Sequence, residues 1–440
     1  MKPLSSCTRQ FLLITLIISS IGLFAQTYFP PAASNNEWDT IAPSDLGYCQ
    51  DSIDALYDFL EDERSKSFIL IKDGKIVLEK YFGTFTEDSL FVWFSAGKSL
   101  RSMLVGIAQE EGHLNINDKT SDYLGTGWTS LDSNKESLIT IKHQLSMSTG
   151  LDETEFDCTT PTCLTYKADA GTRWFYHNSP YNLLKDVLES ATGRTINYLT
   201  NNGVKNKTGM GSGFWLKVGN NTFYFSKARD MARYGLLVQN LGVWDGDTIL
   251  KDSQYYNQMV NSSQTMNPSY GYLWWLNGKA SFIPPGIGTS FNGSLSPNAP
   301  SDAIIAAGAQ GQFISVVPSK GMIMIRQGWA KQQNLTSILL HDNIWARILR
   351  MDCTLSSKEI KADNIEIYPN PATHELRLNS KAPHINDRLV ILNSLGQKLL
   401  EQAWSNSIDV EFLPPGQYYI HLIKEDGERF YSGSFIKSAL

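Results

Sequence analysis

The spacing of apolar residues changes after Cys353, and this change divides the chain into two parts of different fold class. Before Cys353, apolar residues recur at helical spacing in some segments and form short continuous runs in others, which predicts a mixed domain of helices and strands. After it, a polar segment leads into short alternating runs separated by turn residues, which predicts a small all-β sandwich. We expect a large domain at 26–352, a linker at 353–363 and a second domain at 364–440.

The first 25 residues have the pattern of a secretory signal peptide. Lys2 and Arg9 precede an apolar stretch at 11–25 (FLLITLIISSIGLFA), and we expect cleavage after Ala25. The stretch is shorter than the about 20 residues that span a bilayer. The alternative is an uncleaved anchor. No later segment is long and apolar enough to cross a membrane, so we expect no stable transmembrane anchor.

Charge and cysteine content narrow the class of protein. The formal net charge is -6, whereas a general nucleic-acid binder is usually basic, so we expect no nucleic-acid partner. Four cysteines follow the signal segment, and an even number in an exported chain suggests disulfides. Cys158 and Cys163 flank a short turn-forming run and are our first pair, which leaves Cys49 with Cys353; the alternative is four unrelated thiols. No His lies beside a Cys at ligand spacing, so we expect no metal.

The order of expected helices and strands in the large domain predicts an α+β fold with an antiparallel sheet. Asp73-Gly74 between two apolar runs is typical of a hairpin, and Ser179 with Pro180 predicts a helix cap and first helical position. The expected helices are 50–60, 95–112, 179–193 and 335–350, and the expected strands are 68–71, 76–81, 313–317 and 322–326. The second domain has expected strands at 375–378, 389–392, 408–412, 418–423 and 430–436.

Ser95 and Lys98 are the first candidate site residues, since residues three apart at a helix start lie on one face. A nearby amine can take the serine proton if burial or a neighbouring charge lowers its pKa. The pattern alone is weak. It recurs at Ser434 and Lys437, where a strand would direct the two side chains to opposite faces. The alternative for Ser95 is a capping serine followed by a surface lysine.

Two further segments carry suitable chemistry. Tyr176 and Asn178 face the same way if the chain is extended, and a tyrosine can shuttle a proton while an amide orients a carbonyl. The alternative is a packed aromatic beside a turn asparagine. In segment 308–312, Gly308 and Gly311 would let a substrate approach the backbone, and the adjoining N–H groups can supply half of an oxyanion hole. The alternative there is a glycine-rich turn.

These three segments, in this order, resemble the serine β-lactamase and penicillin-binding-protein superfamily, in the branch of class C-like hydrolases, esterases and 6-aminohexanoate-oligomer hydrolases. The resemblance covers about residues 45–350 and extends to 139–151 (ITIKHQLSMSTGL), 170–176 (AGTRWFY), 229–235 (RDMARYG), 270–275 (YGYLWW) and 308–318 (GAQGQFISVVP). It implies a sheet flanked by helices plus a mostly helical subdomain.

The resemblance also implies roles. Ser95 would be the acylated nucleophile, Lys98 its base, and Tyr176 the second acid/base group. The N–H groups of Ser95 and Ala309 would form the oxyanion hole, and Asn178 would help to position the substrate. We therefore expect a secreted serine hydrolase that cleaves an ester or amide bond of a small-molecule or peptide-like substrate without a cofactor. The alternatives are a catalytically silent binding protein of the same fold, or a true β-lactamase or D,D-peptidase.

One departure bears on the substrate. Aligning the family's third motif on Gly308 puts Ala306 where the family often has Lys or His. A cation that pairs with a β-lactam carboxylate is therefore missing there, which disfavours an efficient β-lactamase. Segment 207–209 (KTG) spells that motif literally but follows Tyr176 too closely, and we interpret it as chance. Trp93 and Trp174 could line an acyl pocket or simply pack, and the long loop at 284–301 could be a lid or a variable insertion.

The C-terminal part resembles the type IX secretion sorting domain of Bacteroidetes proteins. The matching segments are 367–371 (IYPNP), 393–396 (NSLG), 408–410 (IDV), 413–419 (LPPGQYY) and 435–437 (FIK). The resemblance implies that residues 364–440 are read by the type IX export machinery and that the protein crosses the periplasm to the cell surface or the medium. The alternative is a carbohydrate-binding or fibronectin-like sandwich.

The resemblance to the hydrolase family also bears on the cysteines. In that fold the first and last helices pack side by side, which implies a Cys49–Cys353 disulfide.

Overall fold

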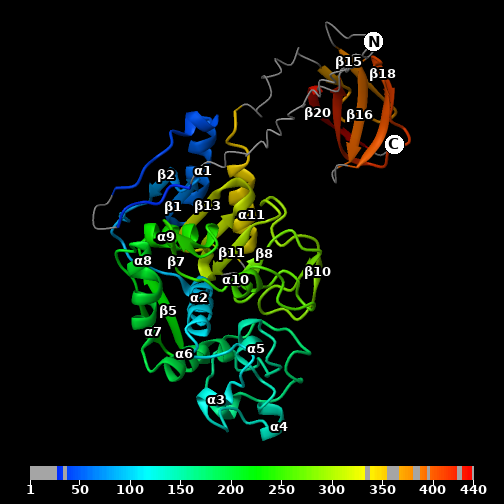
Figure 1. Cartoon of the computed structure of the whole chain (residues 1–440). Coiled ribbons are helices and arrows are strands. Elements are labelled where there is room, and N and C mark those ends of the chain that lie inside the picture. Colours follow the sequence, from blue (N-terminus) through cyan, green and yellow to red (C-terminus); the bar gives the residue numbers. More distant parts are fainter. Residues whose placement is uncertain are drawn as a thin grey trace, which may run out of the picture. The chain divides into compact units, whose positions relative to one another are not determined.

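The computed structural model describes residues 27–32, 37–331, 337–353, 366–379, 387–393, 397–423 and 429–438. The expected signal peptide and the polar segment of the expected linker lie outside these residues. The described residues fall into two compact units, one ending at Met351 and the other beginning at Asp352 (Figure 1).

The first unit is built on a six-stranded antiparallel sheet with the order β2-β1-β13-β12-β11-β8. Its strands are β1 (Ser65–Lys72), β2 (Lys75–Tyr81), β8 (Trp275–Leu276), β11 (Ile304–Gly308), β12 (Gln312–Val317) and β13 (Met322–Gly328). Smaller sheets contain β3 (Phe91–Val92), β4 (Phe214–Val218), β5 (Asn221–Ser226), β6 (Val243–Trp244), β7 (Asp247–Thr248), β9 (Ser281–Phe282) and β10 (Phe291–Asn292). The central strands are almost continuously buried, because helices cover both faces of the sheet.

The β1–β2 hairpin forms at the predicted turn. Lys72 pairs with Lys75, so Asp73 and Gly74 alone make the loop. Both have positive φ, 50° for Asp73 and 87° for Gly74. Two left-handed residues give the turn that matches the twist of the strands, and Asp-Gly is a favoured pair for it.

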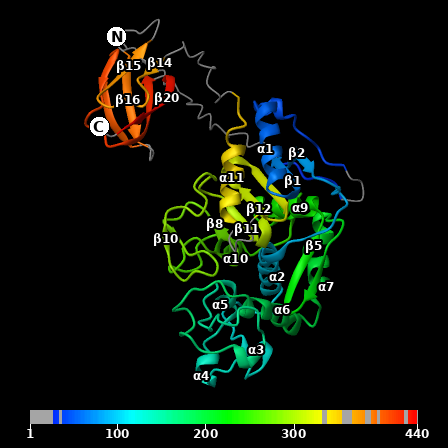
Figure 2. The same ribbon diagram turned by 180° about the vertical axis from the view of Figure 1, so that it is seen from behind.

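Helices cover the two faces of the sheet (Figure 2). On one face, α1 packs on β1 and against α11, and the guanidinium carbon of Arg347 lies 3.6 Å from the ring centroid of Phe59. On the other face, α9 packs on β1, β12 and β13. The helices of this unit are α1 (Gln50–Asp62), α2 (Gly97–Glu110), α3 (Ser121–Leu124), α4 (Ser133–Glu136), α5 (Ile141–Leu145), α6 (Asn178–Thr192), α7 (Ile196–Thr200), α8 (Asn206–Thr208), α9 (Ala228–Gln239), α10 (Ser253–Met259) and α11 (Ile338–Ile348).

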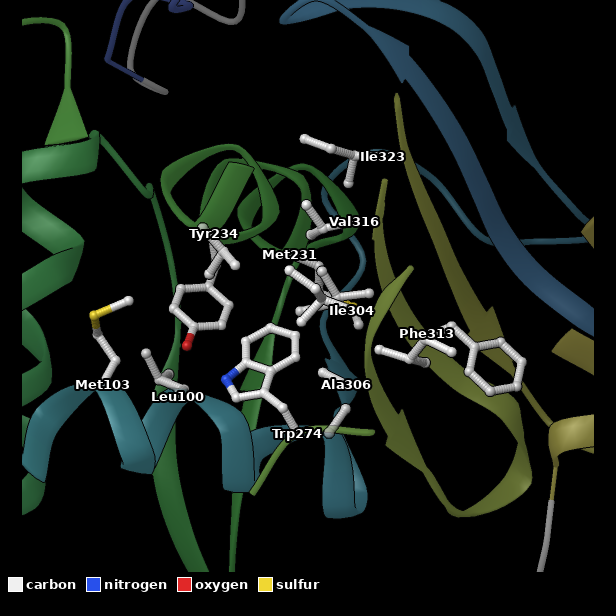
Figure 3. Close-up of a cluster of buried hydrophobic side chains, with 14 of the residues drawn as sticks. Leu100, Met103, Met231, Tyr234, Trp274, Ile304, Ala306, Phe313, Val316 and Ile323 are labelled. Carbon is white, nitrogen blue, oxygen red and sulfur yellow. The ribbon is translucent and has the colours of Figure 1, made fainter. Parts of the chain in front are cut away.

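The core lies where α2, α9 and the sheet meet (Figure 3). Leu100 and Met103 come from α2 at helical spacing, and Met231 and Tyr234 come from α9. Trp274 is fully buried among them. The buried face of α2 therefore holds the helix start, where Ser95 and Lys98 lie, firmly against the sheet.

Three predicted helix starts are shifted. The helix expected from residue 335 is described as α11 from Ile338, with Ser337 as its N-cap. The helix expected from residue 95 begins as α2 at Gly97, because residues 94–96 form a separate 3-10 turn. The helix expected to be capped by Ser179 begins at Asn178, so the predicted cap is wrong. The Ser179 hydroxyl donates instead to the carbonyls of Glu155 and Phe156, at 3.2 and 3.0 Å. Pro180 is still tolerated, because its missing N–H lies in the first turn.

The second unit is a sandwich of two antiparallel sheets, with orders β14-β15-β18 and β17-β16-β19-β20. Its strands are β14 (Glu366–Tyr368), β15 (Glu375–Asn379), β16 (Arg388–Asn393), β17 (Lys398–Ala403), β18 (Ser407–Asp409), β19 (Gly416–Ile423) and β20 (Arg429–Lys437). Alternate residues such as Leu376, Ile391, Ile420 and Phe435 form the core. The all-β prediction is confirmed.

The disulfide prediction is confirmed for Cys158 and Cys163, which are bonded to each other. Cys49 and Cys353 are each disulfide-bonded as well. The backbone N–H of Cys49 donates to the carbonyl of Met351 at 2.8 Å, so the start of α1 lies beside the end of α11. The bonding of Cys49 to Cys353 stays a prediction. Throughout the described residues, we find no helix long and apolar enough to cross a bilayer.

Candidate active site

Ser95 lies in a short 3-10 turn (Phe94–Ala96) between β3 and α2. Phe94, just before it, has φ 46°, an uncommon conformation for a residue with a side chain. Trp93 anchors the turn from inside: it is fully buried and its indole N–H donates to the Ser226 hydroxyl at 2.8 Å. The turn therefore directs Ser95 away from the core at the N-terminus of α2.

Lys98 donates a hydrogen bond to the Ser95 hydroxyl, with 2.9 Å between Nζ and Oγ. The lysine is only 3% exposed. Its other close neighbours are aromatic, because Nζ lies 5.0 Å from the ring centroid of Tyr176 and 4.3 Å from that of Tyr181. Burial, and then the charge of Arg101, hold the pKa of Lys98 well below its usual range. Both causes favour the neutral amine, which is the form of lysine that can accept a proton.

Tyr176 lies two residues before the start of α6, and its side chain is buried, with 6% exposed. Its ring stacks on Trp275 at 5.8 Å between centroids and on Phe156 at 6.5 Å, while Tyr270 meets it edge-on. Burial raises the pKa of Tyr176, and a side-chain hydrogen bond with Ser95 acts in the opposite direction. The phenol is therefore protonated at neutral pH and lies within reach of the Ser95 hydroxyl.

The third predicted segment approaches the Ser95 turn through Gly308, the last residue of β11. A Cβ atom there would overlap the carbonyl oxygen of Trp93 and crowd the backbone N–H of Ala96. The next residues, Ala309–Gly311, form a tight 3-10 turn in which Gln310 has φ 63°. Gly308 thus lets the backbone of Ala309 lie beside the nucleophile.

A fully buried arginine holds this turn. Nη1 of Arg326 donates to the carbonyls of Gln310 and Gly311, at 3.0 and 2.8 Å. The Gln312 amide adds a bond to the Ala309 carbonyl at 3.2 Å and another to the carbonyl of Gly328. The turn after β11 is therefore fixed from behind, by groups that do not reach the cavity.

A cavity of about 260 Å³ opens over Ser95, which is small for a ligand site. The lining is mainly apolar, and none of the described residues in it carries a charged side chain. They are Ser95, Phe156, Tyr176, Asn178, Trp275, Pro285, Gly286, Ala307, Gly308, Ala309, Ser337 and Ile338. The Asn178 amide N–H donates to Asp157 at 2.8 Å, while its carbonyl oxygen has no partner among the described residues.

The structure brings most of the predicted site residues together. Ser95, Tyr176, Asn178, Gly308 and Ala309 line one cavity, and Lys98 contacts it through Ser95. Gly311 does not line the cavity and serves the turn instead, with φ 80°.

Several alternatives raised by the sequence now have a position. Ala306, at the position where the family often has Lys or His, is buried in the core, and its neighbour Ala307 lines the cavity. An alanine side chain carries no charge, so this part of β11 supplies no cation to the cavity. Trp93 and Trp174 are packed and do not line the cavity. The literal motif at 207–209 is the end of α8, and none of its residues is part of the lining.

Pro285 lines the cavity and belongs to the loop at 284–301, which the sequence indicates as a lid or a variable insertion. Sequence reasoning missed Phe156, Ser337 and Ile338, which reach the cavity from a loop and from the start of α11. Their residue types carry no chemical signal. Arg101 was also missed, although a signal existed: Ser95, Lys98 and Arg101 follow one another at intervals of three along one helix face.

A family model described as Beta-lactamase matches residues 58–326. The chain belongs to the beta-lactamase family. Members of this family and of the related penicillin-binding proteins are serine hydrolases, so the predicted superfamily and fold are confirmed. No curated protein matches this sequence.

Solved structures of low sequence identity share the fold. A Bacillus anthracis protein assigned as a 6-aminohexanoate-dimer hydrolase has a TM-score of 0.54 at 15% identity and covers 69% of this chain and 83% of that chain. A Bacteroides dorei DSM 17855 protein assigned as a β-lactamase has a TM-score of 0.55 at 15% identity, covering 70% of this chain and 99% of that chain. A class C β-lactamase in complex with cefoxitin has a TM-score of 0.52 at 17% identity, covering 70% and 99%.

A second family model, the secretion system C-terminal sorting domain, matches residues 366–436. The predicted sorting domain is therefore confirmed, and with it an address at the cell surface or outside the cell. The hydrolase unit and its sorting unit are joined in one exported chain.

Proposed function

We propose that this protein is a secreted esterase or amidase that forms an acyl-enzyme on Ser95. In the first step Ser95 Oγ attacks the substrate carbonyl carbon while its proton passes to the neutral amine of Lys98. The Tyr176 phenol donates a proton to the leaving alcohol or amine as the carbonyl–heteroatom bond breaks. Water then attacks the acyl carbonyl carbon and gives a proton to the Tyr176 phenolate, while the Ser95 oxygen leaves and takes back the proton held by Lys98, so that the acyl group departs as an acid and Ser95, Lys98 and Tyr176 regain their starting states.

The observation that carries this proposal is the 2.9 Å bond between Ser95 and a buried lysine. A lysine in a surface ion pair would be protonated and useless as a base. Lys98 is instead surrounded by aromatic rings, and burial with the charge of Arg101 lowers its pKa, which favours the neutral amine that can act as a base. The backbone N–H groups of Ser95 and Ala309 would stabilise the oxyanion, helped by the N-terminus of α2.

The substrate class follows from the cavity. The described part of the lining has no charged side chain, so it offers nothing to pair with a carboxylate, as efficient β-lactam recognition would need. Asn178 lines the cavity, but its amide N–H is held by Asp157 and its carbonyl oxygen is buried, so the side chain would have to turn to contact a substrate. We therefore favour neutral esters and amides over β-lactams and D,D-peptides, and an active enzyme over a catalytically silent binding protein.

Replacement of the nucleophile tests the proposal. Ser95→Ala should abolish hydrolysis of p-nitrophenyl acetate and leave circular dichroism unchanged. The matched control is Ser434→Ala, because Ser434 and Lys437 repeat the same spacing on β20, where Ser434 is exposed and Lys437 is buried. Hydrolysis at the wild-type rate in folded Ser95→Ala would reject the mechanism.

A further inference from the structure

Arg101 lies one helical turn after Lys98 on α2 and is fully buried. Its Nη1 donates to the carbonyls of Tyr181 and Asn182, at 3.2 and 3.4 Å, and its Nη2 donates to the carbonyl of Thr222 at 3.2 Å. Its Nε has no partner among the described residues. All three acceptors are neutral, so hydrogen bonds satisfy most of the guanidinium without cancelling its charge.

Lys98 and Arg101 share one aromatic neighbour. The Tyr181 ring centroid lies 4.3 Å from Lys98 Nζ and also 4.3 Å from Arg101 Cζ. The Lys98 amine and the Arg101 guanidinium therefore lie no farther apart than the sum of these two distances, and both side chains are buried. The ion pairs found among the described residues of this unit include neither of them. Two like charges this close in a medium of low dielectric repel strongly.

We infer that Arg101 is a positioning residue that acts through Lys98: its buried, uncompensated charge keeps the lysine in the neutral form that can take the serine proton. The inference rests on the proposed function, since it specifies how the base of that site is prepared. After burial, the Arg101 charge is the next cause that lowers the pKa of Lys98.

The other groups around Lys98 do not supply this effect. Asp157, in the loop before α6, raises the pKa of Lys98 and so opposes Arg101. Tyr176 and Tyr181 face the amine, but burial raises the pKa of each and they are neutral. The same holds for Tyr270, which packs on Tyr176 from the segment before β8.

Acidic side chains on α6 act on Arg101 itself. Burial lowers the pKa of the arginine, while Asp186 and Glu189 act in the opposite direction, and a guanidinium keeps its charge even when it is buried. Neither is close enough to form an ion pair with it: Lys185 contacts both carboxylates, at 3.0 and 2.7 Å. The positive charge beside Lys98 is therefore kept but not cancelled.

A purely structural role for Arg101 predicts something different. Its hydrogen bonds join α2 to α6 and β5, so its loss would lower stability and slow the reaction equally at every pH. An electrostatic role shifts the pH at which the reaction becomes slow. The pH profile of acylation separates the two.

The test measures the rate at which a fluorophosphonate labels the full-length protein, as a function of pH, for wild type, Arg101→Gln and Arg101→Met. Removal of the Arg101 charge should raise the pKa of Lys98, so the acidic limb of the rate–pH profile should move up by about one pH unit. Labelling on the acid side should then be about tenfold slower, while the rate on the alkaline plateau should stay the same. Arg233→Gln is the control, because Arg233 is also buried and also donates to backbone carbonyls.

Each result has a distinct meaning. No labelling of wild type at any pH would contradict the proposed function. Labelling of the Arg101 variants with an unshifted limb would overturn the inference alone, as would an equal shift in Arg233→Gln. Failure of both neutral Arg101 variants to fold would assign the residue a structural role and would also overturn it.

Discussion

Gly308 lies directly against the carbonyl oxygen of Trp93, and no side chain fits between them. This contact joins the end of β11 to the turn that carries the proposed nucleophile. It sets how closely the backbone of Ala309 can approach Ser95, and hence whether an oxyanion at that point has donors within reach.

Substitution of Gly308 should therefore uncouple the two halves of the site. In Gly308→Ala the new methyl group must displace β11 or the Ser95 turn, and a displacement of about 1 Å can cost about a hundredfold in rate. We expect fluorophosphonate labelling to slow by that order. Gly288→Ala is the matched control, because its Cβ would meet only Phe175 at 3.9 Å. Equal rates in both variants would show that this contact does not position the site.

Lys98→Met should abolish acylation and at the same time stabilise the protein. The folded-state pKa of Lys98 is lowered from 10.5, so the unfolded chain binds a proton there more tightly than the folded protein does. Wild-type stability should therefore decline as pH falls from about 10.5 through the folded pKa. The variant has no such proton, so its Tm advantage should grow over that interval. Thermal melts at several pH values measure this, and a constant Tm difference would contradict it.

Tyr176→Phe should affect substrates according to their leaving group. A phenol donates a proton usefully only to a basic leaving group, so we expect a loss of about 10²–10⁴-fold for an alkyl ester or an amide. Hydrolysis of a p-nitrophenyl ester should fall much less. The measurement is kcat/KM for matched acyl groups on both leaving groups. An equal loss on both would mean that Tyr176 does not act as the acid.

The uncharged cavity predicts a preference among substrates. An ester whose acyl group carries a carboxylate beside the scissile bond must bury that charge without a partner, which costs several kcal/mol. We expect its kcat/KM to lie at least about tenfold below that of the neutral isostere. Competition between the two esters in one reaction measures the ratio directly. A preference for the carboxylate would indicate a cation that the described lining lacks.

Non-reducing peptide mapping of the full chain should recover Cys49 linked to Cys353. Each is disulfide-bonded, and Cys158 is bonded to Cys163. Because the Cys49–Cys353 link would close a very long loop, its loss should cost about 2–5 kcal/mol of stability. Recovery of either cysteine as a free thiol would reject this pairing.

Much of the fold could be predicted from local patterns. The β1–β2 hairpin follows from Asp73-Gly74, and α1 follows from the spacing of Ile53, Leu56 and Leu60. In contrast, β11 contains two alanines and a glycine, has no alternation, and is a strand because β12 and β8 pair with it. The strand conformation of β11 therefore depends on pairing with its neighbours in the sheet, which no local sequence pattern shows.

The site shows the same division. Ser95, Lys98 and Tyr176 could be singled out because their segments, taken together and in order, resemble those of a known family, and the structure brings these side chains together. Ile338 and Phe156 could not, because an apolar residue becomes a cavity wall only when distant segments meet. The start of α6 at Asn178 was not predicted. The Ser179 hydroxyl does not cap the helix, because it donates to the backbone carbonyls of Glu155 and Phe156, and this tertiary contact has no local signal in the sequence.

The central claim is that Ser95 is an activated nucleophile. The most direct test is intact mass of the protein after exposure to a fluorophosphonate, followed by peptide mapping, with Ser95→Ala beside it. The account predicts a single adduct on wild type, located on the peptide that contains Ser95, and none on the variant. No adduct on folded wild type at any pH, or an equal adduct on the variant, would contradict it.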